Sequence, residues 1–329
     1  MTPGVDDEDD RLAAGVVGVG SMGQHHARVY GELPDTTLVG VHDVDTERAT
    51  TTAAEYRTRP MGRTELLETA DVASVAVPTE HHAQAVRECI AHDVDVLVEK
   101  PFVDDLAVGR ELAAKARRAG VTLQIGHIER FNPATRVLAD LVPDLEVVAV
   151  DVDRLGPPLD RQNGDTVVQD LMIHDVDILL SLLDADITAL GAVAHDEGYV
   201  TAQFKFDTDS VATVTASRHT QEKVRRLSVT AVSCRVTVDF IDQTVEIHRR
   251  SLPEYVESDG DIRYRHESVV ERPMVDSGEP LKAELAAFAD AARNGTEPVV
   301  TPEDALAVLS VLDRIEATAL ADDRTVTAR

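Results

Sequence analysis

The chain has 329 residues, 43% of them hydrophobic, which is enough for two domains with buried cores. Its 60 acidic residues outnumber 32 basic ones, and the net charge of −28 repels the phosphate backbone of nucleic acids. No apolar run approaches the roughly 20 residues that a membrane helix needs. Nucleic acids and membranes are therefore excluded as expected partners.

The first residues, 1–11, form an acidic tail that lacks the basic and apolar regions of a signal peptide, so a cytoplasmic location is expected. Only five of the basic residues are lysines, and an acidic, lysine-poor composition resembles that of proteins from salt-loving archaea. Cys89 and Cys234 are the only cysteines, and two buried thiols are favoured over a disulfide between them.

Residues 12–126 alternate between two kinds of segment. Segments of helical period, such as 81–92 and 104–119, separate short apolar runs at 12–19, 37–41, 72–77, 94–98 and 121–125. The second helical segment ends in a cationic turn followed by Gly120, as helices commonly do. Strands that alternate with helices predict an α/β domain with a parallel, doubly wound sheet, the Rossmann type.

Residues 127–329 have a different pattern, which predicts a second, α+β domain. A helix is expected over 167–183, followed by strand-like runs at 199–206, 211–217, 227–232, 235–241 and 244–248. Short polar breaks between these runs predict a large, mostly antiparallel sheet. Two helices close the chain, and the last begins with Thr301 as N-cap, Pro302 in the first turn and Asp304 three residues after the cap.

A glycine-rich motif, Gly18-Val19-Gly20-Ser21-Met22-Gly23, follows the first apolar run and opens a helix. Gly18 permits the tight turn, Gly20 lets a pyrophosphate approach the backbone, and Gly23 lets helix and strand pack closely. Asp43 ends the second strand, where its carboxylate can bind an adenosine ribose and would repel a 2′-phosphate. We therefore predict a dinucleotide site with NAD as cofactor; a glycine turn without a ligand is the alternative.

Two further motifs follow strands of the same sheet. Pro78-Thr79, with His82, comes after the run at 72–77, and Glu99-Lys100-Pro101 comes after the run at 94–98. Ligands of doubly wound sheets bind beyond the carboxyl ends of the strands, so both motifs are expected beside the glycine loop. Lys100 is one of few lysines in a chain that otherwise uses arginine, which cannot release a proton near neutral pH.

The predicted helix over 167–183 carries a group of polar residues. Asp170, His174 and Asp177 fall at i, i+4 and i+7, on one face of a regular helix. A solvated polar surface explains this pattern equally well. A zinc site is less favoured, because Asp170 and His174 supply two ligands and the sequence offers no third, so no metal is predicted.

Together, the ordered motifs from Gly18–Gly23 through Pro78-Thr79 with His82 and Glu99-Lys100-Pro101 to Asp170 with His174 resemble those of the glucose-fructose oxidoreductase/inositol dehydrogenase (Gfo/Idh/MocA) family. The resemblance covers nearly the whole chain from Leu12. It implies that Ser21 and Met22 belong to the cofactor site with the glycines. It also implies that Lys100 and His174 share a substrate hydroxyl, while Asp170 orients the sugar or the histidine.

The stretch from Gly126 to Pro133 is similar to a narrower branch, the UDP-N-acetylglucosamine 3-dehydrogenases and related sugar-nucleotide enzymes. Arg130, Asn132 and Arg154 are its candidate substrate contacts, with ordinary surface residues as the alternative. Many members of the wider family have glycine where this chain has Met172, which weakens the match to the inositol and glucose enzymes.

The resemblance implies NAD-dependent oxidation of a sugar hydroxyl, with the 3-hydroxyl of a UDP-sugar as the expected position. The reference pKa of a histidine side chain suits a base at neutral pH, so we assign proton transfer to His174 and polarisation of the oxygen to Lys100. Oxidation of a free polyol or aldose and a non-catalytic NAD-binding regulator are the alternatives. The family resemblance also implies a homodimer or homotetramer.

Overall fold

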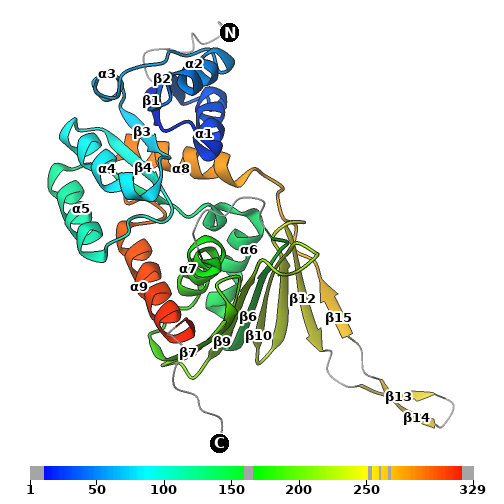
Figure 1. Cartoon of the computed structure of the whole chain (residues 1–329). Helices are drawn as coiled ribbons and strands as arrows, with labels where there is room; N and C mark the ends of the chain where they lie inside the picture. The colour runs from blue at the N-terminus through cyan, green and yellow to red at the C-terminus, as the bar shows by residue number, and fades with distance from the viewer. Residues whose placement is uncertain (1–10, 159–165, 251–253, 259–260, 266–267, 321–329) are drawn as a thin grey trace, which may run out of the picture. The chain divides into compact units, whose positions relative to one another are not determined.

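The computed structural model describes residues 11–158, 166–250, 254–258, 261–265 and 268–320 (Figure 1). These residues form two compact units. The first comprises the chain up to Phe131 together with Gly278–Leu309, and the second comprises Asn132–Ser277 and the residues from Ser310 onward. The sequence pattern predicts a domain boundary after Gly126, with all later residues in the second domain. In the structure, Gly278–Leu309 belongs to the first unit instead. The acidic tail lies outside the described residues except for Arg11.

The first unit contains a five-stranded parallel sheet in the order β2-β1-β3-β4-β5. Its strands are β1 (Leu12–Val17), β2 (Thr36–His42), β3 (Val72–Val75), β4 (Asp95–Glu99) and β5 (Leu123–Gly126). All five overlap the apolar runs predicted from the sequence; β4 and β5 extend one residue beyond them, as β2 does at each end. The strand order reverses between β1 and β3, which makes their carboxyl ends the switch point where doubly wound sheets bind ligands.

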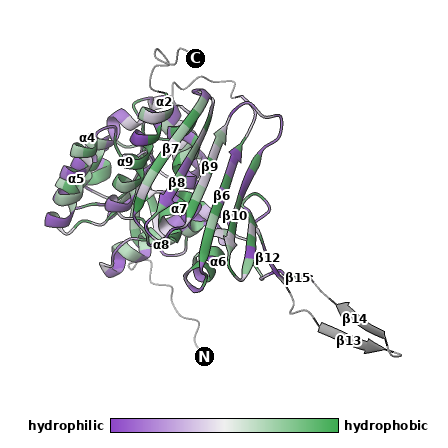
Figure 2. Ribbon diagram, turned by 90° about the horizontal axis from the view of Figure 1, so that it is seen from below, coloured by the Kyte–Doolittle hydropathy of each residue, from purple (hydrophilic) through white to green (hydrophobic). Residues whose placement is uncertain are grey.

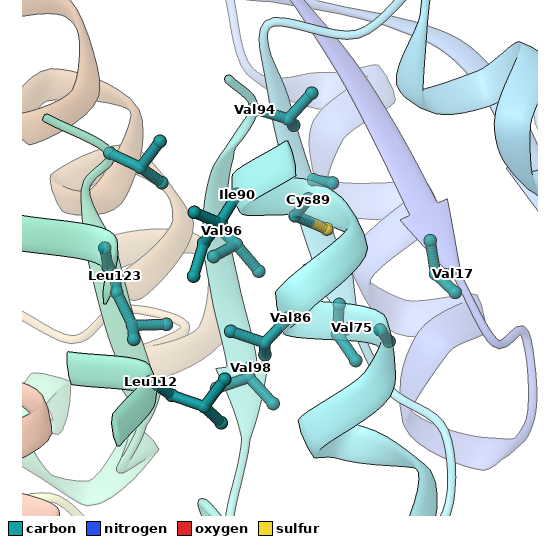
Figure 3. Packing of buried hydrophobic residues seen from close by; sticks show 14 of the residues in the cluster. Val17, Val75, Val86, Cys89, Ile90, Val94, Val96, Val98, Leu112 and Leu123 are labelled. Carbon is teal, nitrogen blue, oxygen red and sulfur yellow. The ribbon is translucent and has the colours of Figure 1, made fainter. Parts of the chain in front are cut away.

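Helices cover both faces of this sheet. One face packs against α3 (Arg63–Leu67), α4 (His82–Ala91) and α5 (Leu106–Ala119), and the other against α1 (Ser21–Glu32), α2 (Thr46–Glu55) and α8 (Pro280–Asn294). Figure 3 shows part of the first core, where Val86 and Ile90 of α4 pack on Val96 and Val98 of β4. Burial of such side chains stabilises a fold by roughly 1.5–3 kcal/mol each. The doubly wound architecture is confirmed.

The second unit is built on an eight-stranded sheet in the order β15-β12-β11-β10-β6-β9-β8-β7. The strands are β6 (Val147–Leu155), β7 (Ile187–Asp196), β8 (Tyr199–Phe206), β9 (Val211–Ser217), β10 (Val224–Ala231), β11 (Cys234–Asp239), β12 (Thr244–Arg250) and β15 (Ser268–Glu271). Every neighbouring pair is antiparallel except β6 and β9. The predicted mostly antiparallel sheet is confirmed, and β13 (Glu254–Ser258) and β14 (Asp261–Arg265) add a separate hairpin.

Helices α6 (Pro133–Leu141) and α7 (Ile173–Leu182) lie on one face of the large sheet (Figure 2). Side chains alternate between buried and exposed along β8. The segment before α7, Val168–Met172, is a π-helix rather than the start of the regular helix that the sequence predicted. Single π-helical turns recur at functional sites because they rotate the side chains that follow.

The closing helix α9 (Pro302–Ala319) begins as predicted. The Thr301 hydroxyl accepts a hydrogen bond from the Asp304 N–H at 3.1 Å, and the Asp304 carboxylate accepts one from the Thr301 N–H at 2.9 Å. This reciprocal capping box satisfies two backbone donors at the helix start. Its apolar stripe is buried at Leu306, Leu312 and Ile315 and half-buried at Leu309.

Both cysteines are buried free thiols, as the sequence favoured. Burial, together with the charge of Glu88, raises the pKa of Cys89 to about 12. Because the thiolate is the reactive form, we expect a thiol reagent at pH 8 to label neither cysteine in the folded protein and both after denaturation. Cys89→Ser should leave one reactive thiol after denaturation. Fast labelling of the native protein would contradict this expectation.

Candidate functional site

The glycine loop joins β1 to α1 and has the backbone geometry of a phosphate-binding turn. Gly18 has a φ of +89°, a conformation that side chains rarely adopt, and a Cβ there would lie 2.7 Å from the carbonyl oxygen of Ala76. A Cβ at Gly23 would lie 1.8 Å from the Gly18 carbonyl oxygen. Both glycines are therefore required by the close approach of α1 to the strand ends.

Gly20 has a different reason to be glycine. A Cβ on Gly20 would meet no atom within 4 Å, so its missing side chain leaves open space in front of the loop. Gly20 is also the N-cap of α1, and no side chain caps the first N–H groups of that helix. Open space and uncapped N–H groups at a helix start suit a pyrophosphate, and the loop therefore fits a dinucleotide.

Asp43 lies directly after β2, where the sequence predicted the ribose-binding acid. Its Oδ2 accepts a hydrogen bond from the Val19 N–H at 2.9 Å, which places the carboxylate against the glycine loop. Arg48 lies 3.4 Å from Asp43 and from Asp45, and no sequence motif pointed to this arginine. Two carboxylates beside one arginine leave a net negative charge, which disfavours a 2′-phosphate.

His82 connects the two motifs that follow β3 and β4. The histidine is 1% exposed, and its ring nitrogens lie 2.8 Å from the Val77 carbonyl oxygen and 2.9 Å from that of Pro101. This bridge fixes the loop that carries Pro78 and Thr79 to the loop that carries Lys100. His82, which the sequence motif groups with Pro78 and Thr79, thus connects their loop to the loop of Lys100.

Glu99 and Lys100 end β4 at the same edge of the sheet as the glycine loop, and the bond from Lys100 to Pro101 is cis. The Glu99 carboxylate lies 2.8 Å from Nε2 of His26, which projects from α1. Burial raises the pKa of Glu99. The hydrogen bond from His26 and the charge of Lys100 outweigh burial and hold that pKa below its usual range. Glu99 is therefore an ionised group, next in the chain to Lys100, whose charge acts on it.

In the second unit, Asp170 lies in the π-helix and His174 in the first turn of α7. The Arg218 guanidinium donates a hydrogen bond to the Asp170 carboxylate at 2.7 Å. Arg218 directly follows β9, and sequence reasoning missed it, although a cation at the end of a predicted strand was an available signal. This ion pair fixes the carboxylate one helical turn before His174.

Two predicted substrate contacts have side chains inside the second unit. Arg154 is 4% exposed and donates from Nε to both carboxylate oxygens of Asp175, at 2.8 and 2.9 Å. Asn132 caps α6 through a bond from the Ala134 N–H and donates to the Phe240 carbonyl oxygen. A role for either residue in binding substrate stays a prediction, as does the role of the half-buried Arg130 in the first unit.

The structure brings the predicted cofactor residues together at one edge of the parallel sheet, and Asp170 and His174 together in the second unit. Lys100 and His174 belong to different units, so their convergence on one hydroxyl stays a prediction. Among the described residues, no cluster of His, Cys, Asp or Glu is arranged to hold a metal ion. No described helix is long and apolar enough to cross a bilayer.

Comparison with known proteins defines the class of protein. Residues 12–127 match a family model described as "Oxidoreductase family, NAD-binding Rossmann fold", so the first unit is the nucleotide-binding part of an oxidoreductase. Residues 145–238 match the model of the GFO/IDH/MocA C-terminal domain. The chain belongs to the Gfo/Idh/MocA family of oxidoreductases, as the sequence motifs indicated.

Named relatives are dehydrogenases. The chain is 34% identical over 248 residues to the UDP-N-acetylglucosamine 3-dehydrogenase of Acidithiobacillus ferrooxidans, covering 73% of this chain and 77% of the relative. It is 25% identical over 321 residues to an inositol 2-dehydrogenase of Rhizobium meliloti, covering 91% and 94%. A solved structure of the Acidithiobacillus enzyme superposes with a TM-score of 0.85 at 28% identity, covering 94% of this chain and 98% of the other.

Mutation can distinguish a structural role of Arg154, in the buried ion pair with Asp175, from a role in substrate binding. Arg154→Met removes the guanidinium that donates to the buried Asp175 carboxylate, and we expect a loss of about 3–5 kcal/mol in the free energy of unfolding. Asp175→Leu added to Arg154→Met should recover most of this loss, because apolar residues can replace a buried ion pair. Denaturant unfolding in concentrated salt provides the measurement. Native stability of Arg154→Met with a raised KM for a UDP-sugar would instead favour substrate binding.

Proposed function

We propose that this protein oxidises the 3-hydroxyl of UDP-N-acetylglucosamine, or of a related UDP-sugar, to the 3-keto sugar with NAD as hydride acceptor. The observation that carries the proposal is Lys100 at the end of β4, beside a glycine loop that fits a dinucleotide, in a chain similar to a UDP-N-acetylglucosamine 3-dehydrogenase. Bound NAD would supply the two-electron chemistry, and the protein supplies binding, orientation and proton transfer.

In this proposal the glycine loop, with Ser21 and Met22, holds the pyrophosphate, and Asp43 binds the adenosine ribose. The negative charge at Asp43 and Asp45 supports NAD over NADP. Pro78 and Thr79 line the nicotinamide end, and Glu99 and Lys100 contact the nicotinamide ribose. His82 keeps these two loops in register through its two carbonyl contacts.

His174 accepts the hydroxyl proton, and Lys100 polarises the same oxygen. A cation beside the hydroxyl favours the alkoxide that develops as hydride leaves, and an imidazole is a suitable base near neutral pH. Asp170, fixed by Arg218, orients the sugar or the His174 ring. Arg130 is the proposed contact for the diphosphate, because two phosphate charges favour a guanidinium partner.

We further propose a homodimer or homotetramer that assembles through the open face of the large sheet, in the cytoplasm of a salt-rich cell. Polar residues of both charges lie on that face around a hollow of about 410 Å³, among them Asp151, Asp153, Arg226 and Arg235. Complementary charges on one surface suit a self-complementary contact between two copies. Sedimentation in molar KCl tests this assembly.

The test of function is NAD reduction in molar KCl with a panel of UDP-sugars, free aldoses and inositols. We expect turnover with UDP-N-acetylglucosamine or a close relative, and NADP should be at least about tenfold poorer. Turnover with inositol alone would replace the proposed substrate by a cyclic polyol, in line with the inositol relatives. NAD binding without oxidation of any sugar would indicate a regulator.

The roles of the two proton-handling residues differ in their pH signatures. We expect Lys100→Met and His174→Ala each to lower kcat by about 10²–10⁴-fold, the range for loss of a positioned acid–base group. The acid limb of kcat should disappear in His174→Ala and persist in Lys100→Met. The profile of kcat from pH 5 to 9 is the measurement. A limb that survives in His174→Ala and vanishes in Lys100→Met would reverse the two assignments.

A further inference from the structure

A chain of buried hydrogen bonds runs through the first unit and ends at Glu99. The Tyr30 hydroxyl lies 2.9 Å from Ser74 Oγ, Ser74 Oγ lies 2.9 Å from Nδ1 of His26, and Nε2 of His26 lies 2.8 Å from the Glu99 carboxylate. Tyr30 and His26 come from α1, Ser74 from β3 and Glu99 from the end of β4. None of the first three residues has any exposed surface.

The donors in this chain can all point in one direction. A carboxylate only accepts, so the hydrogen of the ring lies on Nε2 and is donated to Glu99. Nδ1 then accepts from the Ser74 hydroxyl, and Ser74 Oγ accepts from the Tyr30 hydroxyl. Each member is satisfied, and the donors lead from the core towards the negative charge. Burial raises the pKa of Tyr30, and the charge of Glu284 from α8 also raises it, so the phenol stays a donor.

The surroundings of Glu99 fix its carboxylate in place. His26 lies on one side, the charge of Lys100 acts on it from the next residue, and a Cβ at Gly126 of β5 would lie 3.2 Å from its Oε2. The carboxylate thus fits between the α1 histidine and a β5 glycine, where any larger residue would be in close contact. Glu99 has little freedom to take another orientation.

We propose that His26 is a positioning residue, which holds the Glu99 carboxylate ionised and aimed so that Lys100 is kept in its working orientation. The inference rests on the proposed function, in which Lys100 touches the substrate and Glu99 the cofactor. A purely structural helix-to-sheet contact would be served by apolar side chains at lower desolvation cost. This polar chain instead ends at the strand end that carries Lys100.

The mechanism of the effect is electrostatic. Without His26, burial is the largest remaining influence on Glu99, and it raises the pKa of this carboxyl group. The carboxyl group then takes up a proton at a higher pH, and Lys100 loses its negative neighbour. Loss of His26 should therefore reduce cofactor binding and turnover most strongly at the acid end of the pH range, and least at alkaline pH.

The experiment compares His26→Leu with His26→Gln, whose amide can replace the Nε2 donor. The neighbouring, exposed His25 provides the control His25→Leu. NADH affinity is measured by fluorescence from pH 5 to 8 in molar KCl, and the Glu99 titration by carboxyl ¹³C NMR, with the signal identified by its loss in Glu99→Gln. We expect the NADH affinity of His26→Leu to fall by about tenfold towards pH 5, because without the His26 donor the Glu99 carboxyl group takes up a proton at a higher pH.

His26→Gln should restore most of the affinity, and His25→Leu should match the wild type. Ser74→Ala, a small change in side-chain volume, should move the Glu99 titration in the same direction and keeps the test valid if His26→Leu does not fold. An unchanged Glu99 titration and NADH profile in the His26 and Ser74 variants would overturn the proposal. Absence of sugar oxidation by the wild type would contradict the proposed function alone, since both readouts here need no sugar.

Discussion

The close contact between α1 and the end of β1 is the constraint on which the first unit depends. Gly23 packs against the Gly18 carbonyl, so the helix begins very close to the end of the strand. The first N–H groups of the helix lie at Gly20, which leaves open space in front of them. The same closeness brings the buried side of α1 within hydrogen-bond distance of the neighbouring strands. Gly18 and Gly23 allow the close approach in which His26 contacts Ser74 and Glu99 and Tyr30 contacts Ser74.

Two of the ion pairs in the second unit flank His174 in the sequence. Arg154 with Asp175 lies inside the unit and joins strand β6 to helix α7, while Arg218 with Asp170 is partly exposed. A buried pair constrains geometry because each partner is costly to leave alone. The partly exposed pair can exchange contacts with a ligand. The segment that carries His174 is thus held by a buried ion pair at Asp175 and a partly exposed ion pair at Asp170.

Much of this architecture could be predicted from local sequence signals. The parallel strands, the antiparallel sheet and the capping box at Thr301 follow from periodicity and from the residues that start helices, and the sequence motifs indicated the family. Other features depend on contacts between distant residues. The return of Gly278–Leu309 to the first unit, the burial of Arg154 and the pairing of Asp170 with Arg218 have no periodic signature. The π-helix was missed because its one extra residue per turn leaves an apolar pattern that reads as an ordinary helix.

The split course of the first unit has a consequence for how the protein is made. Leu281, Leu285 and Phe288 of α8 belong to the same core cluster as Ala14 and Val16 of β1. During synthesis, the amino-terminal sheet emerges from the ribosome long before the helix that completes its core. The apolar sheet face that α8 covers therefore stays without this helix until most of the polypeptide has been translated. Partial collapse or a chaperone must shield it during that time.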